Sequence, residues 1–264
     1  MRLRLHIELE HNDRGIIPVN YQYAVSSWIY SRLAVADPEF SSWLHEQGYR
    51  DGFRSFKLFT FSNIQIQGKL FDDDRLILAE KNGFLEISFL VEEAMGIFIS
   101  GLFNDAAFRI GDAKSSACFV VRSVECLKNP DFLEMMNYKT LSPIVVSRFD
   151  EARGQPAYLS PDQPGYGELF FNNLIHKFSV AKGAQNTIDD DLMPQMGNFR
   201  LLSEPHSRLI TIKAGQAKES KIRGFMFDFS LTAPVSLHRT GYFAGFGEKN
   251  SMGFGCVGEK NNIS

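Results

Sequence analysis

A glycine-rich run near the C-terminus is the feature that most restricts how this chain can fold. Between residues 241 and 255, five glycines fall within fifteen positions, and an aromatic residue stands beside most of them. Glycine tolerates positive φ angles and lets another backbone segment approach closely, so this density predicts a tight, preformed loop. Lys249, Asn250 and Ser251 at its centre, together with exposed amides, suit contact with a phosphodiester backbone. A hairpin that only turns the chain is the alternative.

The same run contains a literal nucleotide-binding pattern that fails on its context. Gly253, Gly255 and Gly258 match G-x-G-x-x-G, but only six residues follow. A dinucleotide site needs a helix directly after that pattern, within a βαβ unit, and no helix fits there. The chain also lacks the G-x-x-x-x-G-K-[ST] sequence of a phosphate-binding loop. We therefore set both kinds of nucleotide site aside.

Length, charge and cysteine content narrow the class of protein. A chain of 264 residues suits one large domain or two of about 130. Three cysteines without a C-x-x-C pair predict a reducing cytoplasm and no structural zinc. There is no long apolar run and no signal-peptide core at the N-terminus, so we expect a cytoplasmic protein without a membrane span. The net charge of −3 argues against indiscriminate binding of polyanions, and it requires any RNA site to be a local basic surface.

Hydrophobic periodicity in the first half predicts strands and helices in a recognisable order. Apolar and polar residues alternate from 2 to 9, which is typical of a half-buried strand. Apolar positions at helical spacing predict a helix over 21–35, and Asp37-Pro38 suits the start of a second helix that reaches about Gln47. The remaining expected elements are strands at 57–66, 76–79, 83–90 and 117–127 and a helix at 92–103. The order β-α-β-β-α-β, with a divided first helix, is a ferredoxin-like unit.

The second half repeats this order more loosely, after a linker at 128–131. Its expected elements are strands at 141–149, 207–213, 223–232 and 252–257, a helix at 166–180 and a short helix after Pro234. We therefore predict an α+β protein of two tandem ferredoxin-like (RRM-like, βαββαβ) domains, residues 1–127 and 128–264, with the glycine-rich loop in the second. The phenylalanines are expected to fill the cores, because the aromatic signature of an RNA-recognition motif is absent from the strands.

Two polar aromatic side chains point away from the predicted core on consecutive helices. At about 100° per residue, the apolar stripe of the first helix centres on Val25, Trp28 and Ile29. Tyr30 projects well off that stripe, and His45 lies roughly opposite the buried face of the second helix. A tyrosine and a histidine so placed could share a cleft; two ordinary surface residues are the alternative.

Three segments of the chain resemble a known family. The run Gly245-Phe-Gly-Glu-Lys-Asn-Ser-Met-Gly-Phe-Gly255 is similar, almost residue for residue, to the glycine-rich loop of the CRISPR-associated endoribonucleases. These enzymes cut repeat RNA into guide RNAs and are members of the repeat-associated mysterious protein superfamily. Residues 140–145 (Thr-Leu-Ser-Pro-Ile-Val) and 57–62 (Lys-Leu-Phe-Thr-Phe-Ser) resemble two further segments of that family. The resemblance extends from end to end and implies two ferredoxin-like units side by side.

The resemblance also implies a catalytic set. Tyr30 and His45 fall where that family carries a catalytic tyrosine and histidine, and Lys57 falls on a catalytic lysine. The loop before Lys57 varies in length among relatives, so Arg50 or Arg54 is the alternative third member. These residue types fit attack by the RNA's own 2′-hydroxyl, which needs one proton taken, another given, and a cation beside the phosphorus. Such a reaction needs no metal and no cofactor and leaves a 2′,3′-cyclic phosphate and a 5′-hydroxyl, while the acid and base assignments of Tyr30 and His45 stay open.

Contacts with RNA are expected in two places. The loop contributes backbone and side chains that suit a phosphodiester: Gly245, Gly247, Lys249, Asn250 and Ser251. A second cluster of cations is interpreted as a phosphate-contacting strip, with a charged hairpin turn as the alternative. Its members are Lys213, Lys218, Lys221 and Arg223. The acidic runs 72–74 and 189–191 lack a partner carboxylate at defined spacing, so we expect solvated loop residues there rather than a metal site.

The sequence thus favours a metal-independent endoribonuclease that cleaves CRISPR repeat RNA in the precursor transcript. A non-catalytic repeat-RNA-binding subunit of a CRISPR effector complex is the alternative, because the superfamily includes such scaffolds, and a purely structural domain is a more remote one. Repeat RNA is the expected partner. Other subunits of a CRISPR-associated complex, and a second copy of the chain in a homodimer, are left open.

Overall fold

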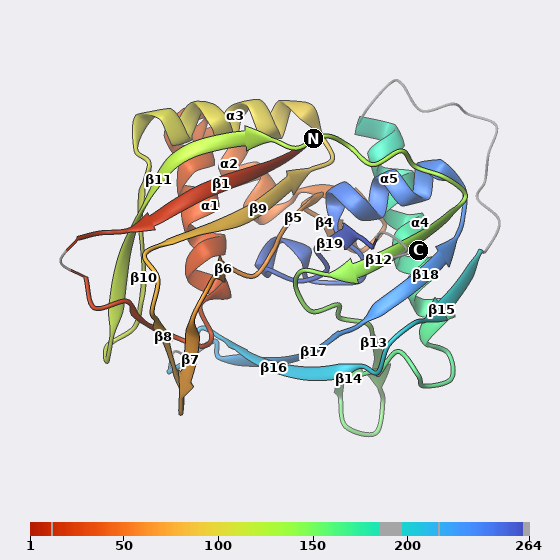
Figure 1. Ribbon diagram of the computed structural model, residues 1–264. Helices are drawn as coiled ribbons and strands as arrows, with labels where there is room; N and C mark the ends of the chain where they lie inside the picture. The colour runs from red at the N-terminus through yellow and green to blue at the C-terminus, as the bar shows by residue number, and fades with distance from the viewer. Residues whose placement is uncertain (12, 185–196, 216, 261–264) are drawn as a thin grey trace.

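The computed structural model describes residues 1–11, 13–184, 197–215 and 217–260. Two α/β halves lie side by side, the first coloured red to green and the second green to blue (Figure 1). In each half, helices cover one face of an antiparallel sheet. This is the α+β architecture that the sequence predicted.

The first sheet is built around its N-terminal strand. The order across the sheet is β10-β11-β1-β9-β5, and β6 also pairs with β9. Without the added edge strand β10, this is the antiparallel order of a ferredoxin-like unit. The bounds are β1 (Arg2–Leu9), β5 (Phe59–Phe61), β6 (Gln65–Ile66), β9 (Asn82–Phe89), β10 (Ala107–Gly111) and β11 (Ser116–Cys126). The alternation in β1 buries Leu3, Leu5, Ile7 and Leu9, as predicted.

Three helices accompany this sheet: α1 (Gln22–Ala36), α2 (Pro38–Glu46) and α3 (Glu92–Asn104). The predicted stripe of α1 is buried, and the Trp28 ring stacks on Phe108 with centroids 4.4 Å apart. Asp37 separates α1 from α2 with an extended backbone, and its carboxylate accepts a hydrogen bond from the Phe40 amide at 2.8 Å. With Pro38 in the first turn, this cap starts α2 in a new direction.

The second half repeats the arrangement with the sheet order β15-β18-β12-β19. Its elements are β12 (Met135–Thr140), α4 (Tyr166–Ala184), β15 (Asn198–Leu201), β18 (Asp228–Thr232), α5 (Val235–Ala244) and β19 (Val257–Glu259). Between α4 and the sheet, Phe170, Phe199, Phe229 and Phe246 pack with ring centroids 5.2–5.8 Å apart. The phenylalanines therefore fill a core here, as expected from the sequence.

Hairpins and short strands are added to these two units. They are β2 (Ile16–Pro18), β3 (Tyr49–Asp51), β4 (Arg54–Phe56), β7 (Lys69–Asp72), β8 (Arg75–Leu78), β13 (Ser147–Asp150), β14 (Gln155–Tyr158), β16 (His206–Ile212) and β17 (Ser220–Met226). The pairs β3–β4, β13–β14 and β16–β17 are each antiparallel two-stranded hairpins. The site described below lies among them.

Three predicted strands of the second half are wrong in their bounds. Residues 141–149 are not one strand: Pro143 has no N–H to donate, and the amides of Leu141 and Ser142 both donate to the Cys256 carbonyl. Residues 223–232 divide at Phe227 into β17 and β18, which pair in different sheets. Residues 252–257 hold the end of a 3₁₀ turn, η1 (Asn250–Met252), and glycines at positive φ, so that pairing begins only at Val257.

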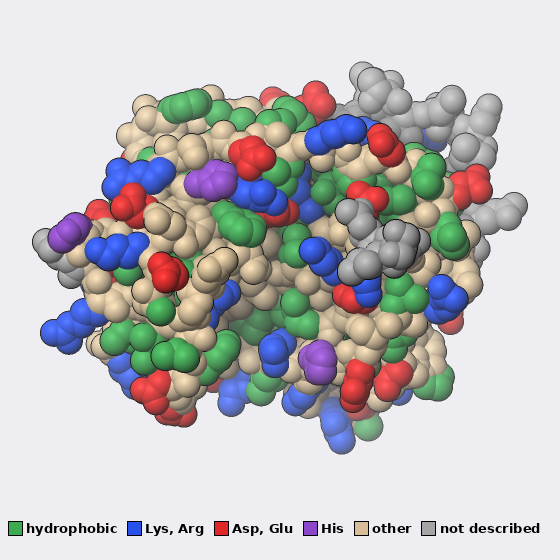
Figure 2. All heavy atoms as spheres, in the orientation of Figure 1, with side chains coloured by type: hydrophobic (Ala, Val, Ile, Leu, Met, Phe, Trp, Pro, Cys, Tyr) green, Lys and Arg blue, Asp and Glu red, His purple; other side chains and the backbone are tan. Residues whose placement is uncertain are grey.

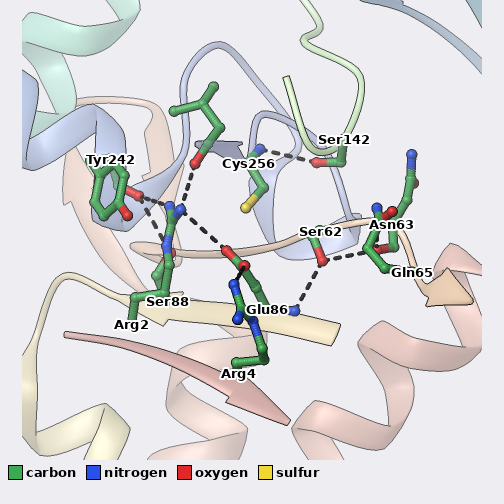
Figure 3. A network of polar contacts seen from close by, with 11 residues as sticks. Arg2, Arg4, Ser62, Asn63, Gln65, Glu86, Ser88, Ser142, Tyr242 and Cys256 are labelled. Atoms are coloured by element: carbon green, nitrogen blue, oxygen red, sulfur yellow. Dashed lines mark hydrogen bonds and ion pairs between the residues drawn. The ribbon is translucent and has the colours of Figure 1, made fainter. Parts of the chain in front are cut away.

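A buried arginine joins the two halves. Arg2, on β1, is 1% exposed, and its guanidinium donates to the backbone carbonyls of Val257 at 2.5 Å and Tyr242 at 2.6 Å (Figure 3). It also lies 3.6 Å above the Tyr242 ring and 3.6 Å from a carboxylate oxygen of Glu86, which Arg4 contacts at 2.8 Å. A buried charge with this many partners fixes the first sheet against the end of the second half.

Candidate RNA-cleavage site

The side chains of Tyr30 and His45 lie against each other. Tyr30 is on α1 and His45 is in the last turn of α2, and their rings meet edge to face with centroids 5.0 Å apart. Phe59 on β5 contacts the Tyr30 ring with a centroid distance of 5.6 Å. His45 is exposed and Tyr30 is half-buried. The structure therefore brings together the two side chains that the helical spacing placed off the core.

One face of α1 carries Tyr30 to the glycine-rich loop. Gln22, Ser26 and Tyr30 recur every four residues, so they lie along one side of the helix. The Ser26 hydroxyl donates to the Ser251 carbonyl oxygen at 2.7 Å, and Tyr30 shares a side-chain hydrogen bond with Ser251. Gln22 packs under Gly253, where an added Cβ would come within 3.1 Å of its Cγ. Tyr30 leaves the apolar stripe because it faces this loop.

The Tyr30 hydroxyl is held in its protonated form. Burial raises the pKa of Tyr30 to about 12, and the hydrogen bond with Ser251 acts in the opposite direction. At neutral pH the phenol can therefore donate a hydrogen bond, whereas it is a poor proton acceptor.

Lys57 lies at the foot of the β3–β4 hairpin, beside the end of the helix that carries His45. Its Nζ atom donates to the Ser55 hydroxyl at 3.2 Å and would lie 3.0 Å from a Cβ added at Gly48. Burial lowers the pKa of Lys57, and the neighbouring Arg50 guanidinium lowers it further. The two alternative cations lie on the same hairpin, on either side of its turn.

A cleft of about 460 Å³ connects this hairpin with the glycine-rich loop. The first half contributes Arg54 and Lys57 to its walls, and the second half contributes Lys249 and part of α4. Ser251 also lines it and links it to Tyr30. Arg50 instead lines a separate cavity on the other side of the hairpin. Of the three candidates for the third catalytic position, Lys57 and Arg54 thus face the cleft.

The glycine-rich loop has a shape that only glycine permits at its key positions. At Gly247, φ is 65° and a Cβ would lie 2.3 Å from the Val145 carbonyl oxygen. At Gly255, φ is 79° and a Cβ would lie 2.0 Å from the Phe246 carbonyl oxygen. The glycines are therefore explained by close backbone approach as well as by positive φ.

Within this loop, neighbouring polar residues do different things. Asn250 is 9% exposed, and its amide nitrogen donates to the carbonyls of Phe246 and Phe254, both at 3.0 Å. The group that the sequence assigned to RNA contact is thus engaged with the loop's own backbone. Lys249, by contrast, is exposed at the cleft, with a left-handed backbone (φ 59°).

The structure adds a lysine that sequence reasoning did not single out. Lys177 on α4 is 2% exposed and donates to the carbonyl oxygens of Gly245 at 2.6 Å and Gly247 at 2.5 Å. Burial lowers the pKa of Lys177 to about 7, while the nearby Glu248 carboxylate acts in the opposite direction. The signal was present in the sequence, because Lys177 interrupts an otherwise apolar helical stripe.

The predicted cation strip lies on the β16–β17 hairpin. Lys213 is half-buried, with its Nζ atom 5.3 Å from the centre of the Tyr23 ring on α1. The other three members are exposed: Lys218, Lys221 and Arg223. The buried face of the hairpin packs with Phe254, so the strip is anchored to the glycine-rich loop.

Charge is mixed over much of the surface. On the face shown in Figure 2, the blue side chains of Lys and Arg are interspersed with the red ones of Asp and Glu. In the described part of the chain, no group of three or more His, Cys, Asp or Glu is placed to hold a metal ion. Of the acidic runs, 72–74 includes Asp74, which pairs with Arg75 and Lys114 at 2.9 Å each, and 189–191 lies outside the described residues. No described helix is both long and apolar enough to cross a bilayer.

Two family models cover most of the chain. Residues 16–125 match the model of the CRISPR-associated protein Cas6 N-terminal region, and residues 127–259 match that of the Cas6 C-terminal region. The chain belongs to the Cas6 family. CRISPR-associated endoribonuclease Cas6 1 of Methanocaldococcus jannaschii is 29% identical over 257 residues, covering 97% of this chain and 92% of the relative. CRISPR-associated endoribonuclease Cas6 of Pyrococcus furiosus is 26% identical, covering 99% and 91%.

A solved structure gives the same fold. The structure of a Cas6-related protein from Pyrococcus furiosus superimposes with a TM-score of 0.82 at 23% identity, over 99% of both chains. The resemblance predicted from the glycine-rich loop is thus confirmed at the level of family, and the tandem ferredoxin-like architecture is confirmed at the level of fold.

Proposed function

We propose that this protein is an endoribonuclease that cleaves CRISPR repeat RNA in the precursor transcript and releases guide RNAs. The observation that carries the proposal is the edge-to-face contact of Tyr30 with His45, which the hydrogen bond of Tyr30 with Ser251 joins to the wall of a cleft that presents Lys57 and Lys249. Membership of the Cas6 family supports it, since the relatives from Methanocaldococcus jannaschii and Pyrococcus furiosus are named endoribonucleases.

In the proposed reaction, the RNA supplies its own nucleophile. The 2′-hydroxyl oxygen attacks the adjacent phosphorus in line, and the bond from phosphorus to the 5′-oxygen of the next nucleotide breaks. The products are a 2′,3′-cyclic phosphate and a 5′-hydroxyl, so no water takes part as nucleophile, and we propose that side chains fill every role without a metal ion. The protein has to take the proton of the 2′-hydroxyl, give one to the leaving oxygen, and stabilise charge on the phosphoryl oxygens.

The environment of each side chain suggests its role. Because burial moves the pKa of the Tyr30 phenol still further above neutral pH, we assign it the donation of a hydrogen bond to the reacting group. Proton transfer then falls to His45, a residue type suited to it near neutral pH, whose side chain is exposed beside Tyr30. Lys57, with Arg54 as its alternative, stabilises the phosphoryl charge from the hairpin wall of the cleft.

A single-turnover cleavage assay in EDTA tests this assignment. His45→Ala should cut repeat RNA about 10²–10⁴-fold more slowly than the wild type while binding it equally well. Glu46→Ala, one residue further along the same helix and also exposed, is the matched control. Normal cutting by the histidine variant would refute the role of His45, and loss of wild-type activity in EDTA would refute metal independence. Tight binding without any cut product would instead identify a non-catalytic RNA-binding subunit.

We also propose that the domains divide between residues 127 and 128. The support is that most buried residues before this point form one hydrophobic cluster and most of those after it form another. Limited proteolysis should then cut first in the segment 128–131, and a first cut inside either sheet would argue against this boundary.

A further inference from the structure

The tip of the β3–β4 hairpin exposes a phenylalanine that the fold does not use. Asp51 and Arg54 close a two-residue turn, and Gly52 takes the positive φ (57°) that such a turn requires at its first position. Phe53 occupies the second position and is fully exposed, at 111% of the reference area. A polar residue would serve the turn equally well, so packing within the protein does not explain this phenylalanine.

A second exposed phenylalanine lies on another hairpin that lines the same cleft. Ser147 and Phe149 are two positions apart on β13, so their side chains project from one face. The Ser147 hydroxyl donates to a carboxylate oxygen of Glu248 in the glycine-rich loop at 2.9 Å, and Ser147 lines the cleft. This face of the strand is therefore turned toward the cleft. Phe149 extends it outward with 68% of its surface exposed.

Each of these rings has an exposed arginine next to it in the chain. Arg54 follows Phe53 and lines the cleft, whereas Arg148 precedes Phe149 and projects from the opposite face of β13. Lys57 and Lys249 line the same cleft as Arg54 and Ser147. Two aromatic faces thus accompany a run of cations along one opening.

Three carboxylates of the two hairpins and the glycine-rich loop are engaged with other groups. Asp51 pairs with His176 at 2.5 Å, the Asp150 carboxylate accepts from the Ala152 amide at 3.1 Å, and Glu248 accepts from Ser147. Glu248 keeps its negative charge, but it is the single carboxylate among the described residues that line the cleft, against Arg54, Lys57 and Lys249, so the opening is cationic on balance.

From this juxtaposition we propose that Phe53 and Phe149 are stacking residues for unpaired nucleotides of the RNA that enters and leaves the cleft. The inference rests on the proposed function, because it takes RNA as the ligand. An exposed ring binds the face of a base, and a neighbouring guanidinium binds the phosphate, whatever the base. Bases inside a duplex have both faces covered by their neighbours, so the two rings select single-stranded RNA at the cleft.

A protein partner fits these rings less well. Docking surfaces for proteins are contiguous apolar patches, whereas Phe53 and Phe149 are single rings on separate hairpins, each beside an arginine. The charge around them is complementary to a phosphodiester chain.

Binding to an uncleavable RNA tests the proposal. The probe is the repeat RNA of the protein's own genome with a 2′-O-methyl group on every nucleotide, so that no 2′-hydroxyl can attack. Phe53→Ala and Phe149→Ala should each weaken binding of this single strand about 5- to 150-fold. When the same RNA is annealed to its complement, both variants should bind the duplex as tightly as the wild type does.

Matched variants separate stacking from other effects. Phe53→Trp keeps a stacking face and should bind like the wild type, whereas Phe53→Leu keeps apolar area without that face and should bind like the alanine variant. Phe71→Ala, which removes another exposed ring (76%) on the β7–β8 hairpin, should change nothing. Because neither Phe53 nor Phe149 is buried, all variants should fold.

Each result decides the matter. Unchanged single-strand affinity of both alanine variants, or wild-type affinity of Phe53→Leu, would overturn the proposal. So would alanine variants that bind RNA normally but lose self-association, which would mark a protein contact. Failure of the proposed function looks different, because a wild type that binds the single strand through these rings yet never cuts natural repeat RNA would leave the stacking intact.

Discussion

Replacing Lys177 by methionine should change how stability depends on pH. Methionine has nearly the volume of lysine without its charge, so Lys177→Met keeps the packing under the glycine-rich loop. It removes the donor to the carbonyls of Gly245 and Gly247, and it removes the cost of burying an ammonium group.

These two effects nearly cancel at neutral pH. A pKa near 7 in the folded protein, against 10.5 in the unfolded chain, corresponds to about 4 kcal/mol of lost stability at pH 7. Replacement by methionine recovers this lost stability, but each of the two carbonyls left without a donor costs about 1–3 kcal/mol. We therefore expect the free energy of unfolding of the variant to lie within about 2 kcal/mol of the wild type at pH 7.

The free energy of unfolding of the wild type minus that of Lys177→Met should increase as the pH rises. Between pH 7 and 10.5 the unfolded chain binds a proton at Lys177 that the folded protein has released, so this group makes the wild type more stable as the pH rises through that window. From pH 7 to pH 9 the gain is about 2 kcal/mol, and the methionine variant cannot share it.

Urea unfolding at pH 7 and pH 9 measures this gain directly. The wild type minus Lys177→Met difference should rise by about 2 kcal/mol between the two values. Lys182→Met, which changes a partly exposed lysine on the same helix, serves as the control for a lysine-to-methionine change on α4. A wild type minus Lys177→Met difference that is the same at both pH values would refute the assignment of a buried, pKa-shifted amine at Lys177.

Three further predictions follow from the loop and the interface. Gly247→Ala should destabilise the protein by at least about 2 kcal/mol more than Gly52→Ala. Both glycines have positive φ, but only at Gly247 would an added Cβ meet a backbone oxygen. Thermal unfolding of the two variants measures the difference, and equal destabilisation would contradict the loop geometry. Arg2→Leu should cost about 3–5 kcal/mol in urea unfolding, since it leaves two buried carbonyls without a donor and removes one of the two cations beside the Glu86 carboxylate; a loss under 1 kcal/mol would mean that the interface does not depend on this residue. Lys249→Ala should lower the slope of log affinity for repeat RNA against log salt by about one, and an unchanged slope would remove Lys249 from the RNA site.

The sequence predicted the parts of the site that local periodicity determines. Tyr30 and His45 lie on helices whose apolar stripes are regular, so their outward direction followed from about 100° per residue. The helix cap at Asp37-Pro38, which begins α2, could also be predicted from the sequence. The family resemblance supplied Lys57, and the structure places it beside the end of α2.

What the sequence did not show depends on contacts between distant segments. The sequence shows Lys177 only as an interruption of an apolar stripe, and its two carbonyl partners lie in the glycine-rich loop, some seventy positions later in the chain. The predicted strand at 141–149 failed because its amides find partners at Cys256, which no local pattern reveals. Asn250 is of a residue type that often binds ligands, and only its two hydrogen bonds to the carbonyls of Phe246 and Phe254 show that it closes the loop.

The glycine-rich loop belongs structurally to both halves, and this explains why the candidate site cannot reside in either one. From the first half, Thr60 donates to the Phe254 carbonyl at 2.9 Å and Ser26 donates to that of Ser251. From the second half, Lys177 holds two more carbonyls of the same loop. Because Tyr30 bonds to Ser251, the position of its hydroxyl is set by a loop that needs donors from both sides. The proposed chemistry is therefore a property of the docked halves, and any change that separates them should disable cleavage without touching Tyr30 or His45.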